Sequence, residues 1–300
     1  MAEFTVPDEM DGISVRSFLR RQCGVSARLL AKLKRTENGM TVNGRIVRSI
    51  DILRGGDTVC LVFPQDSPEI VPVMMGLDIV YEDDSILITD KPPFMPVHPV
   101  HVHQLDTLAN GVMYYLQSRG EGCTFRAVNR LDRDTSGLVM IAKNSFAHTF
   151  LSHNTEKKYM ALCEGIISSE GTIDAPIELA PGHTIQRRVG ENGVRAVTHY
   201  RPLETLSGHT LLELSLETGR THQIRTHLSY LGHPLAGDDM YGGSVEIFRR
   251  QCLHCSEMSF IHPLTRERII LKSPPEDWLS VLREKCGGNK QCAAEDGGTE

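Results

Sequence analysis

The sequence has no apolar stretch near the roughly 18–20 consecutive residues that a membrane-crossing helix requires. Its acidic start, MAEFTVPDEMDG, has no apolar core of the kind found in secretion signals, so we expect no such signal. The eight cysteines are scattered through the chain and form no disulfide-type framework. We interpret them as reduced thiols and expect a cytoplasmic protein.

An overall basic charge is also lacking, because 38 acidic residues outnumber 32 Lys and Arg and leave a net charge of −6. This balance argues against a protein that binds nucleic acid over its whole surface. The average hides a local asymmetry, since residues 16–48 hold nine Lys or Arg and a single acid, Glu37. A chain of 300 residues is long enough for one large domain together with a small one.

The basic segment near the N-terminus has the pattern of two helices followed by a hairpin. Residues 14–21 predict a short amphipathic helix, and Ser26 is a suitable N-cap for a second helix over 27–35. Asn43-Gly44 between alternating apolar residues is a strong signal for a two-residue hairpin turn. We therefore predict a small helix-helix-hairpin domain.

Three basic residues of the predicted second helix share one face, opposite a leucine stripe: Arg28, Lys32 and Arg35. Such a row is more often solvated surface than a binding site. The excess of nine bases over one acid favours binding, because uncompensated like charge costs stability unless a polyanion offsets it. We expect this segment to contact RNA or DNA.

Strand patterns outnumber helix patterns from Leu77 to about Pro275 and do not alternate with them strictly. This favours an α+β fold with a mixed, mainly antiparallel central sheet, flanking helices and a cleft. The predicted strands cover 79–81, 86–89, 138–142, 159–163, 196–200, 210–216 and 269–271, and the predicted helices cover 108–117, 146–153 and about 222–231. The predicted parts are a small domain over 1–64, a linker over 65–76, a large domain over 77–285 and a disordered tail over 286–300.

Residues 129–138, NRLDRDTSGL, place two aspartates and two arginines directly before an apolar run. One interpretation is a surface loop whose charges form ion pairs. The other is a catalytic carboxylate held ionised by an arginine at the mouth of a cleft. The candidates are Asp132 and Asp134, and the motif alone leaves both interpretations open.

Residues 216–242 contain three histidines and an arginine among apolar neighbours. The histidines are five and six positions apart, which does not align them on one helix face, so we expect no metal there. Cys252 and Cys255 form a single CxxC motif without a second one to pair with it, so they also give little support for a zinc site. Arg225 follows a turn at Gly219 and a possible cap at Thr221. Its charge requires a carboxylate or phosphate partner, either a structural glutamate or one of the two candidate aspartates.

Two further features have both a structural and a functional interpretation. Tyr159, at the start of a predicted strand, is either a half-buried core residue or a ring that stacks on a nucleobase. The pair Arg187-Arg188 lies in a glycine-rich loop and is either solvated or in contact with phosphate. The proline-rich stretch 90–99 is expected to shape the rim of a cleft.

Several long motifs resemble, in the same order, those of the RNA pseudouridine synthases, in particular the branch that modifies ribosomal and transfer RNA. They are NRLDRDTSGLVMIAKN, KKYMALCEG, RAVTHY, ETGRTHQIRTHLSYLGHPLAGDDMYG and CLHCSEMSFIHPLTRE. Residues 10–64, with VNGRIV and GGDTVCLV, also resemble the small RNA-binding module shared by a ribosomal protein and bacterial tyrosyl-tRNA synthetases. The resemblance covers residues 10–280.

The resemblance implies conversion of uridine within structured RNA, with ribosomal RNA favoured and tRNA possible, to its carbon-linked isomer without metal or cofactor. It assigns the catalytic aspartate to Asp132, the arginine partner to Arg225 and the tyrosine on the target base to Tyr159. Beside the aspartate, Arg130 and Arg133 are candidates for RNA contact, with Arg187 and Arg188 further along. We expect a monomer.

The family commonly has a histidine where this chain has Asn129, which leaves the role of this side chain open. Two alternatives remain. The first is a catalytically inactive RNA-binding or ribosome assembly factor of the same fold, against which the intact aspartate, tyrosine and arginine argue. The second is a metal-dependent hydrolase built on the histidines.

Overall fold

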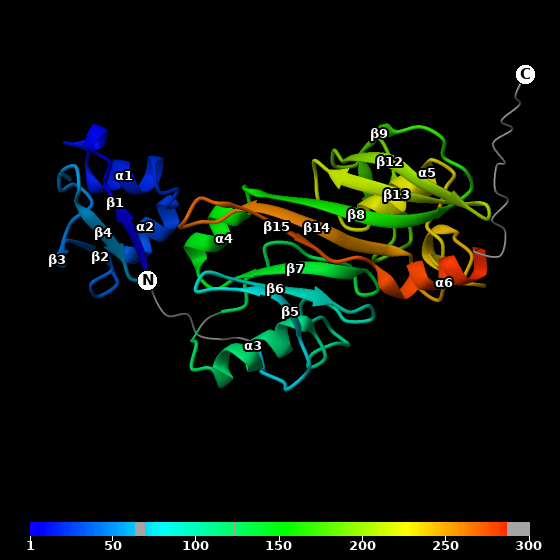
Figure 1. Ribbon diagram of the computed structural model, residues 1–300, viewed down its shortest axis with the longest axis horizontal. Helices are drawn as coiled ribbons and strands as arrows, with labels where there is room; N and C mark the ends of the chain where they lie inside the picture. The colour runs from blue at the N-terminus through cyan, green and yellow to red at the C-terminus, as the bar shows by residue number, and fades with distance from the viewer. Residues whose placement is uncertain (64–69, 123, 287–300) are drawn as a thin grey trace, which may run out of the picture. The chain divides into compact units, whose positions relative to one another are not determined.

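The chain divides into two compact units in a computed structural model that describes residues 1–63, 70–122 and 124–286 (Figure 1). Unit 1 comprises Met1–Lys157 and Glu257–Ser273, and unit 2 comprises Lys158–Ser256 and Pro274–Glu300. Residues 65–69 of the predicted linker and 287–300 of the predicted tail lie outside the described residues. No described helix combines the length and the apolar character needed to span a membrane.

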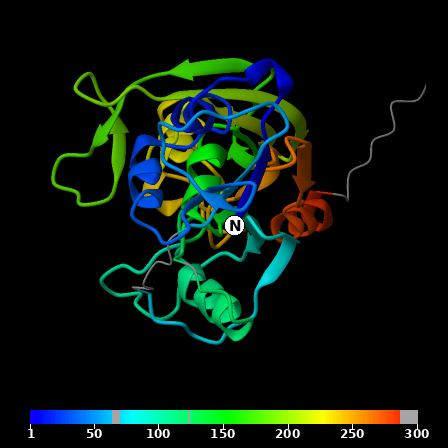
Figure 2. The same cartoon turned by 90° about the vertical axis from the view of Figure 1, so that its left-hand side faces the viewer.

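The N-terminal part of unit 1 is a small sheet with two short helices, blue in Figure 2. Its strands pair in the order β1-β4-β2-β3, and every pair is antiparallel. The elements in chain order are β1 (Ala2–Thr5), η1 (Asp8–Met10), α1 (Val15–Arg21), α2 (Ala27–Leu33), β2 (Met40–Val42), β3 (Arg45–Ile46) and β4 (Thr58–Leu61).

Local sequence signals explain most of these elements. Ser26 caps α2 by accepting a hydrogen bond from the backbone N–H of Leu29 at 3.1 Å, as predicted. Asn43 and Gly44 both have positive φ, 49° and 77°, which a tight hairpin turn between β2 and β3 requires. The predicted end of the second helix is wrong, because α2 stops at Leu33 and Arg35 lies in the following turn.

The rest of unit 1 is a sheet in the order β5-β6-β7-β14, with β15 paired to β14. Strand β7 is buried along its whole length, as expected for an apolar run in a sheet interior. Asn144 caps α4 by accepting a hydrogen bond from the backbone N–H of Ala147 at 2.8 Å. The elements are β5 (Asp78–Glu82), β6 (Ile86–Lys91), α3 (Leu108–Ser118), β7 (Ser136–Ala142), α4 (Ser145–Leu151), β14 (Leu253–Ile261) and β15 (Arg268–Lys272).

A shared apolar core joins the N-terminal sheet to α4 within unit 1. Phe146 of α4 is buried in the same cluster as the helix residues of the N-terminal part. Its ring centroid lies 5.6 Å from that of Phe4 and 6.1 Å from that of Phe63. Arg266, in the turn between β14 and β15, places its guanidinium 4.3 Å from the ring centroid of Phe150.

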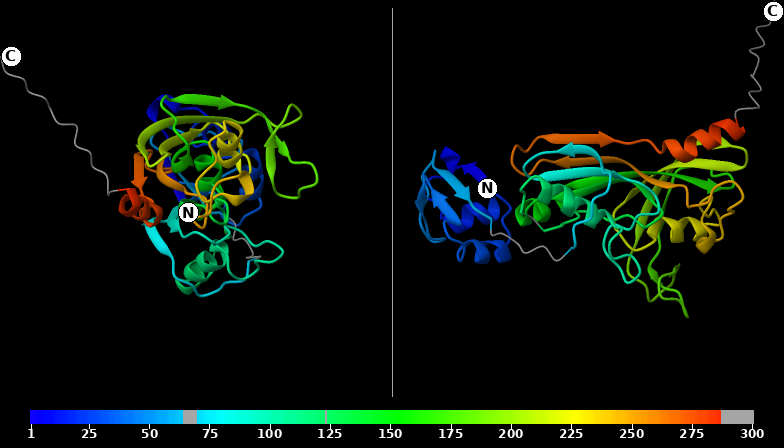
Figure 3. Two further views of the ribbon diagram at one scale, coloured as in Figure 1. Left: turned by 90° about the vertical axis from the view of Figure 1, so that its right-hand side faces the viewer. Right: turned by 90° about the horizontal axis from the view of Figure 1, so that it is seen from below.

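The strands of unit 2 pair in the order β8-β13-β12-β9, and the hairpin β10–β11 stands out from them (light green in Figure 3). Helix α6 packs through Trp278, Leu279 and Leu282 against sheet residues that include Leu162 and Leu211. The elements are β8 (Thr155–Glu164), β9 (Gly171–Asp174), β10 (Ile177–Leu179), β11 (Arg187–Val189), β12 (Val197–Leu206), β13 (His209–Leu216), α5 (Gln223–Tyr230), η2 (Asp239–Tyr241) and α6 (Glu276–Cys286).

The predicted α+β class is confirmed, and all the predicted strands and helices of the large domain are present. The elements missed from the sequence include β1 of the small sheet and, in the predicted large domain, β9, β14, α6, the hairpin β10–β11 and the short helix η2.

Replacing Phe146 with alanine is expected to destabilise unit 1 by about 3–5 kcal/mol, because a fully buried ring leaves a cavity in the shared core. Urea unfolding followed by far-UV circular dichroism measures the loss of unfolding free energy. The matched control is Phe94→Ala, since Phe94 is 58 % exposed. Equal stability of the two variants would contradict the shared core.

Candidate active site

The charged loop of residues 129–138 is an ordered turn that leads into β7. Asp132 is half-buried, and its carbonyl oxygen accepts a hydrogen bond from the backbone N–H of Thr135 at 3.2 Å. Strand β7 begins directly afterwards, at Ser136. Gly137 has φ 111°, a conformation that other residues rarely adopt, so the sharp entry into the strand requires glycine here. The loop therefore presents Asp132 from a fixed backbone.

Asn129 anchors the start of this loop to β7. Its side-chain Nδ2 donates to the carbonyl of Leu138 at 3.1 Å, and its Oδ1 accepts from the backbone N–H of Met140 at 2.9 Å. The side-chain amide thus pairs with the backbone of β7 as a neighbouring strand would, by donating one hydrogen bond and accepting another. These contacts give the residue that departs from the family pattern a structural role in holding the loop.

A buried lysine holds the other side of the loop. Lys91, at the end of β6, is 0 % exposed. Its ammonium group donates to the carbonyl oxygens of Pro92 and Met95, both at 2.8 Å, and of Arg133 at 3.1 Å. The proline-rich stretch and the aspartate loop are therefore tied to one buried charge, which the sequence analysis did not identify.

The motif contains an ion pair between two neighbouring residues. Arg133 donates from Nε and Nη2 to the carboxylate of Asp134, at 2.7 and 3.0 Å. This neighbouring pair is partly exposed. Arg130 is exposed as well.

Arg225 lies on α5 in unit 2 and is 5 % exposed. Its Nε and Nη2 donate to the two oxygens of Asp238, both at 2.7 Å. Its guanidinium lies 4.9 Å from the ring centroid of Tyr241. A carboxylate in the guanidinium plane and an aromatic ring on its face are the contacts that make such burial tolerable.

A carboxylate partner for Arg225 was expected from the sequence, but Asp238 was not among the candidates. Asp238 is buried and belongs to the GDD stretch that follows α5, which was a usable signal. The predicted cap at Thr221 is wrong, because His222 occupies the N-cap position with φ 56° and without a side-chain capping bond.

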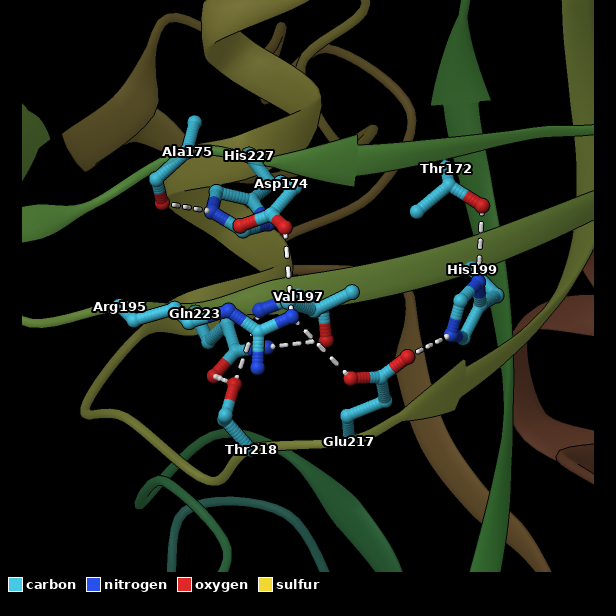
Figure 4. A network of polar contacts seen from close by, with 10 residues as sticks. All are labelled: Thr172, Asp174, Ala175, Arg195, Val197, His199, Glu217, Thr218, Gln223 and His227. Carbon is cyan, nitrogen blue, oxygen red and sulfur yellow. Dashed lines mark hydrogen bonds and ion pairs between the residues drawn. The ribbon is translucent and has the colours of Figure 1, made fainter.

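A polar network fastens α5 to β12 (Figure 4). The Gln223 amide donates to the carbonyl of Val197 at 2.9 Å and accepts from the Thr218 hydroxyl at 2.9 Å. His227 lies 2.8 Å from Thr198 Oγ1 through Nδ1 and 3.0 Å from the carbonyl of Ala175 through Nε2. Both histidine nitrogens therefore bond to protein groups and serve to fix the helix that carries Arg225.

Burial lowers the pKa of His227, and the carbonyl of Ala175 opposes the shift more weakly. The neutral ring fits its neighbours, since Nε2–H donates to that carbonyl and Nδ1 accepts from the threonine hydroxyl. This arrangement does not suit a metal ligand. Within the described ranges no three His, Cys, Asp or Glu side chains gather closely enough to hold a metal ion.

Tyr159 lies on β8, opposite Leu214 of β13, and only a small part of it is exposed. It belongs to unit 2, as Arg225 does, whereas Asp132 belongs to unit 1. The strand begins at Thr155, so Tyr159 lies within the strand and not at its start as predicted.

A hollow of about 450 Å³ lies against the sheet of unit 2 and is lined by charges of both signs. Arg201 donates to Glu213 at 2.8 Å, and Lys158 lies 3.4 Å from the same carboxylate. The hollow is not lined by Tyr159 or Arg225. Its charges balance one another, so it has no marked preference for an anion or a cation.

The two arginines of the hairpin differ in their contacts. Arg188 donates from Nε to Glu178 across the hairpin at 2.8 Å. The Nε–H of Arg187 is buried and has no hydrogen-bond partner among the described residues. Arg188 is already paired with a carboxylate, which makes Arg187 the better candidate for an RNA phosphate.

The comparisons with known proteins agree with this fold. Residues 85–230 match the family model described as RNA pseudouridylate synthase. A Bacillus subtilis protein named Uncharacterized RNA pseudouridine synthase YjbO is 40 % identical over 271 residues, which cover 87 % of this chain and 96 % of that protein. The Ribosomal large subunit pseudouridine synthase D of Pseudomonas aeruginosa is 40 % identical over 267 residues, with 81 % and 82 % covered.

Among solved structures, Human RNA Pseudouridylate Synthase Domain Containing 1 is similar with a TM-score of 0.56 and 28 % identity, covering 69 % of this chain and 86 % of that one. The chain belongs to the RNA pseudouridine synthases. It is therefore an isomerase that acts on RNA, and the main prediction from the sequence is confirmed.

Asp238→Asn is expected to cost about 3–5 kcal/mol of stability, because the buried charge of Arg225 loses its carboxylate. Urea unfolding at neutral pH measures the change. The control is Asp239→Asn, because Asp239 is the exposed neighbour of Asp238. Its free energy of unfolding should stay within about 0.5 kcal/mol of the wild-type value. A loss that is the same for both variants would contradict the assignment of Asp238 as the partner.

Proposed function

We propose that the protein converts uridines of ribosomal RNA to pseudouridine in the cytoplasm, with Asp132 as the nucleophile. The observation that carries this proposal is the turn at Asp132, which is anchored on one side by Asn129 and on the other by Lys91. The named activity of the Pseudomonas relative supports ribosomal RNA as the substrate, with tRNA as the second choice.

The chemistry requires little beyond a positioned carboxylate. In the reaction the bond between ribose C1′ and uracil N1 breaks, and a bond between C1′ and C5 forms. The proton on C5 leaves and N1 gains one, so the product is an isomer of the substrate. An ionised aspartate is a sufficient nucleophile, whether it attacks the ribose carbon or the uracil ring.

Arg225 is the proposed partner of this carboxylate, and Tyr159 is the proposed ring against the target base. Support for Arg225 comes from its rigid setting, since Asp238 and Tyr241 hold the guanidinium in one orientation. A fixed cation near a nucleophile favours the ionised form and directs it. The target uridine must leave its stack before it can meet these groups.

RNA contact is assigned to the exposed basic residues of the N-terminal part and to the hairpin. Arg28, Lys32 and Arg35 are all exposed. Arg130 and Arg133 flank the nucleophile. In the hairpin we favour Arg187 over Arg188, because Glu178 already satisfies Arg188. We also propose that residues 1–64 act as a separate RNA-binding module and that the protein is a monomer.

Asp132→Asn is expected to abolish pseudouridine formation in ribosomal RNA taken from cells that lack the gene, while RNA binding persists. The amide keeps the size of the side chain but removes its nucleophilic charge. Release of tritium from C5-labelled uridine measures the reaction. The matched control is Asp134→Asn, which should keep most of the activity. If both variants were fully active, the proposed nucleophile would be wrong.

The combined variant Arg28→Gln, Lys32→Gln and Arg35→Gln is expected to weaken RNA binding and to reduce the slope of log K against log salt by about 2. Filter binding between low and moderate salt measures the slope. Substitution is preferable to deletion of residues 1–63, because deletion would expose Phe146. A matched triple variant at Arg195, Arg201 and Lys272 serves as the control. An unchanged slope in the first variant would refute the proposed RNA contact.

A further inference from the structure

The tight turn of residues 237–243 contacts Arg225 on two sides. Asp238 holds the guanidinium in its plane, and Tyr241 of η2 covers its face. The carbonyl of Asp238 accepts from the backbone N–H of Tyr241 at 3.2 Å and from that of Gly243 at 2.8 Å. One short segment therefore supplies both groups that make the burial of Arg225 tolerable.

The same turn also holds the hairpin β10–β11. The hydroxyl of Tyr241 accepts a hydrogen bond from the backbone N–H of Arg187 at 2.9 Å. The side chain of Gln186 donates to the carbonyl of Met240 at 2.8 Å. Two bonds thus fix the start of β11 to the segment that contacts Arg225.

A third bond completes the arrangement around the tyrosine hydroxyl. Nδ1 of His222, the N-cap residue of α5, lies 2.9 Å from the oxygen. Because the hydroxyl already accepts from Arg187, it can donate to His222. Tyr241 is buried, and its ring and hydroxyl contact two elements: β11 through Arg187, and α5 through both its N-cap His222 and Arg225.

The hairpin depends on such anchoring. Its two strands have only three residues each and stand out from the sheet (Figure 3). An isolated hairpin of this length is not stable in water. Leu179 and Ile185 are exposed on it, so the hairpin buries little apolar surface of its own.

We infer that Tyr241 is a positioning residue that couples the RNA-contacting hairpin to Arg225. Its hydroxyl sets the place of Arg187, and its ring sets the orientation of the catalytic arginine partner. This inference rests on the proposed function, because it takes RNA as the ligand of the hairpin. It predicts that the hydroxyl contributes to RNA binding and that the ring contributes to the chemical step.

Two substitutions separate these contributions. Tyr241→Phe keeps the ring on Arg225 but removes both hydroxyl bonds, so KM for ribosomal RNA from the deletion strain should rise about tenfold with kcat within about twofold. Tyr241→Leu removes the ring as well and should lower kcat by a further factor of about ten. The matched control is Tyr230→Phe, since Tyr230 is 64 % exposed at the end of α5.

Hydrogen exchange without RNA provides an independent readout. The backbone amide of Arg187 should exchange at least about tenfold faster in Tyr241→Phe than in the wild type, while amides of β13 should be unchanged. Unchanged exchange at Arg187, or a fall in kcat with an unchanged KM in Tyr241→Phe, would overturn the inference. A wild-type protein that forms no pseudouridine would instead refute the proposed function, and the exchange result would still decide the coupling.

Discussion

The burial of one positive charge, that of Arg225, constrains helix α5, the turn that follows it and the hairpin bonded to that turn. A guanidinium removed from water requires a carboxylate, further acceptors and a rigid setting. The turn after α5 supplies the carboxylate of Asp238 and the ring of Tyr241. This turn is possible only because Gly237 and Gly243 have no Cβ, which would collide with the carbonyl oxygens of Arg250 and Leu235. The stability of this region and the orientation of Arg225, the proposed partner of the nucleophile, depend on the same contacts.

Unit 1 uses a second buried charge in a comparable way. Lys91 bonds to carbonyl oxygens of the proline-rich stretch and of the aspartate loop, so two irregular segments share one anchor. Loops that carry catalytic groups must be held by contacts other than their own secondary structure. A buried ammonium with three acceptors achieves this, and Asn129 adds a fixed point on β7. The proposed nucleophile therefore lies on a rigid turn.

Features set by neighbouring residues were predictable from the sequence. The hairpin at Asn43-Gly44 and the cap at Ser26 depend on local chemistry, and β7 shows its burial in an unbroken apolar run. The particular partners of the buried charges were not identified, because local chemistry does not single them out. Arg225 and Asp238 are 13 residues apart and Lys91 and Arg133 are 42 apart, and no periodic pattern encodes such a contact. The hairpin β10–β11 was missed because its strands are too short to show alternation.

The most direct test of the account is to map pseudouridines in RNA from cells that lack the gene and from the same cells carrying the wild type or Asp132→Asn. Sites are read as reverse-transcription stops after chemical labelling of pseudouridine. The account predicts that at least one ribosomal RNA stop vanishes in the deletion and returns with the wild type alone. If the wild type restored no site in any RNA, or if Asp132→Asn restored it equally well, the account would be contradicted.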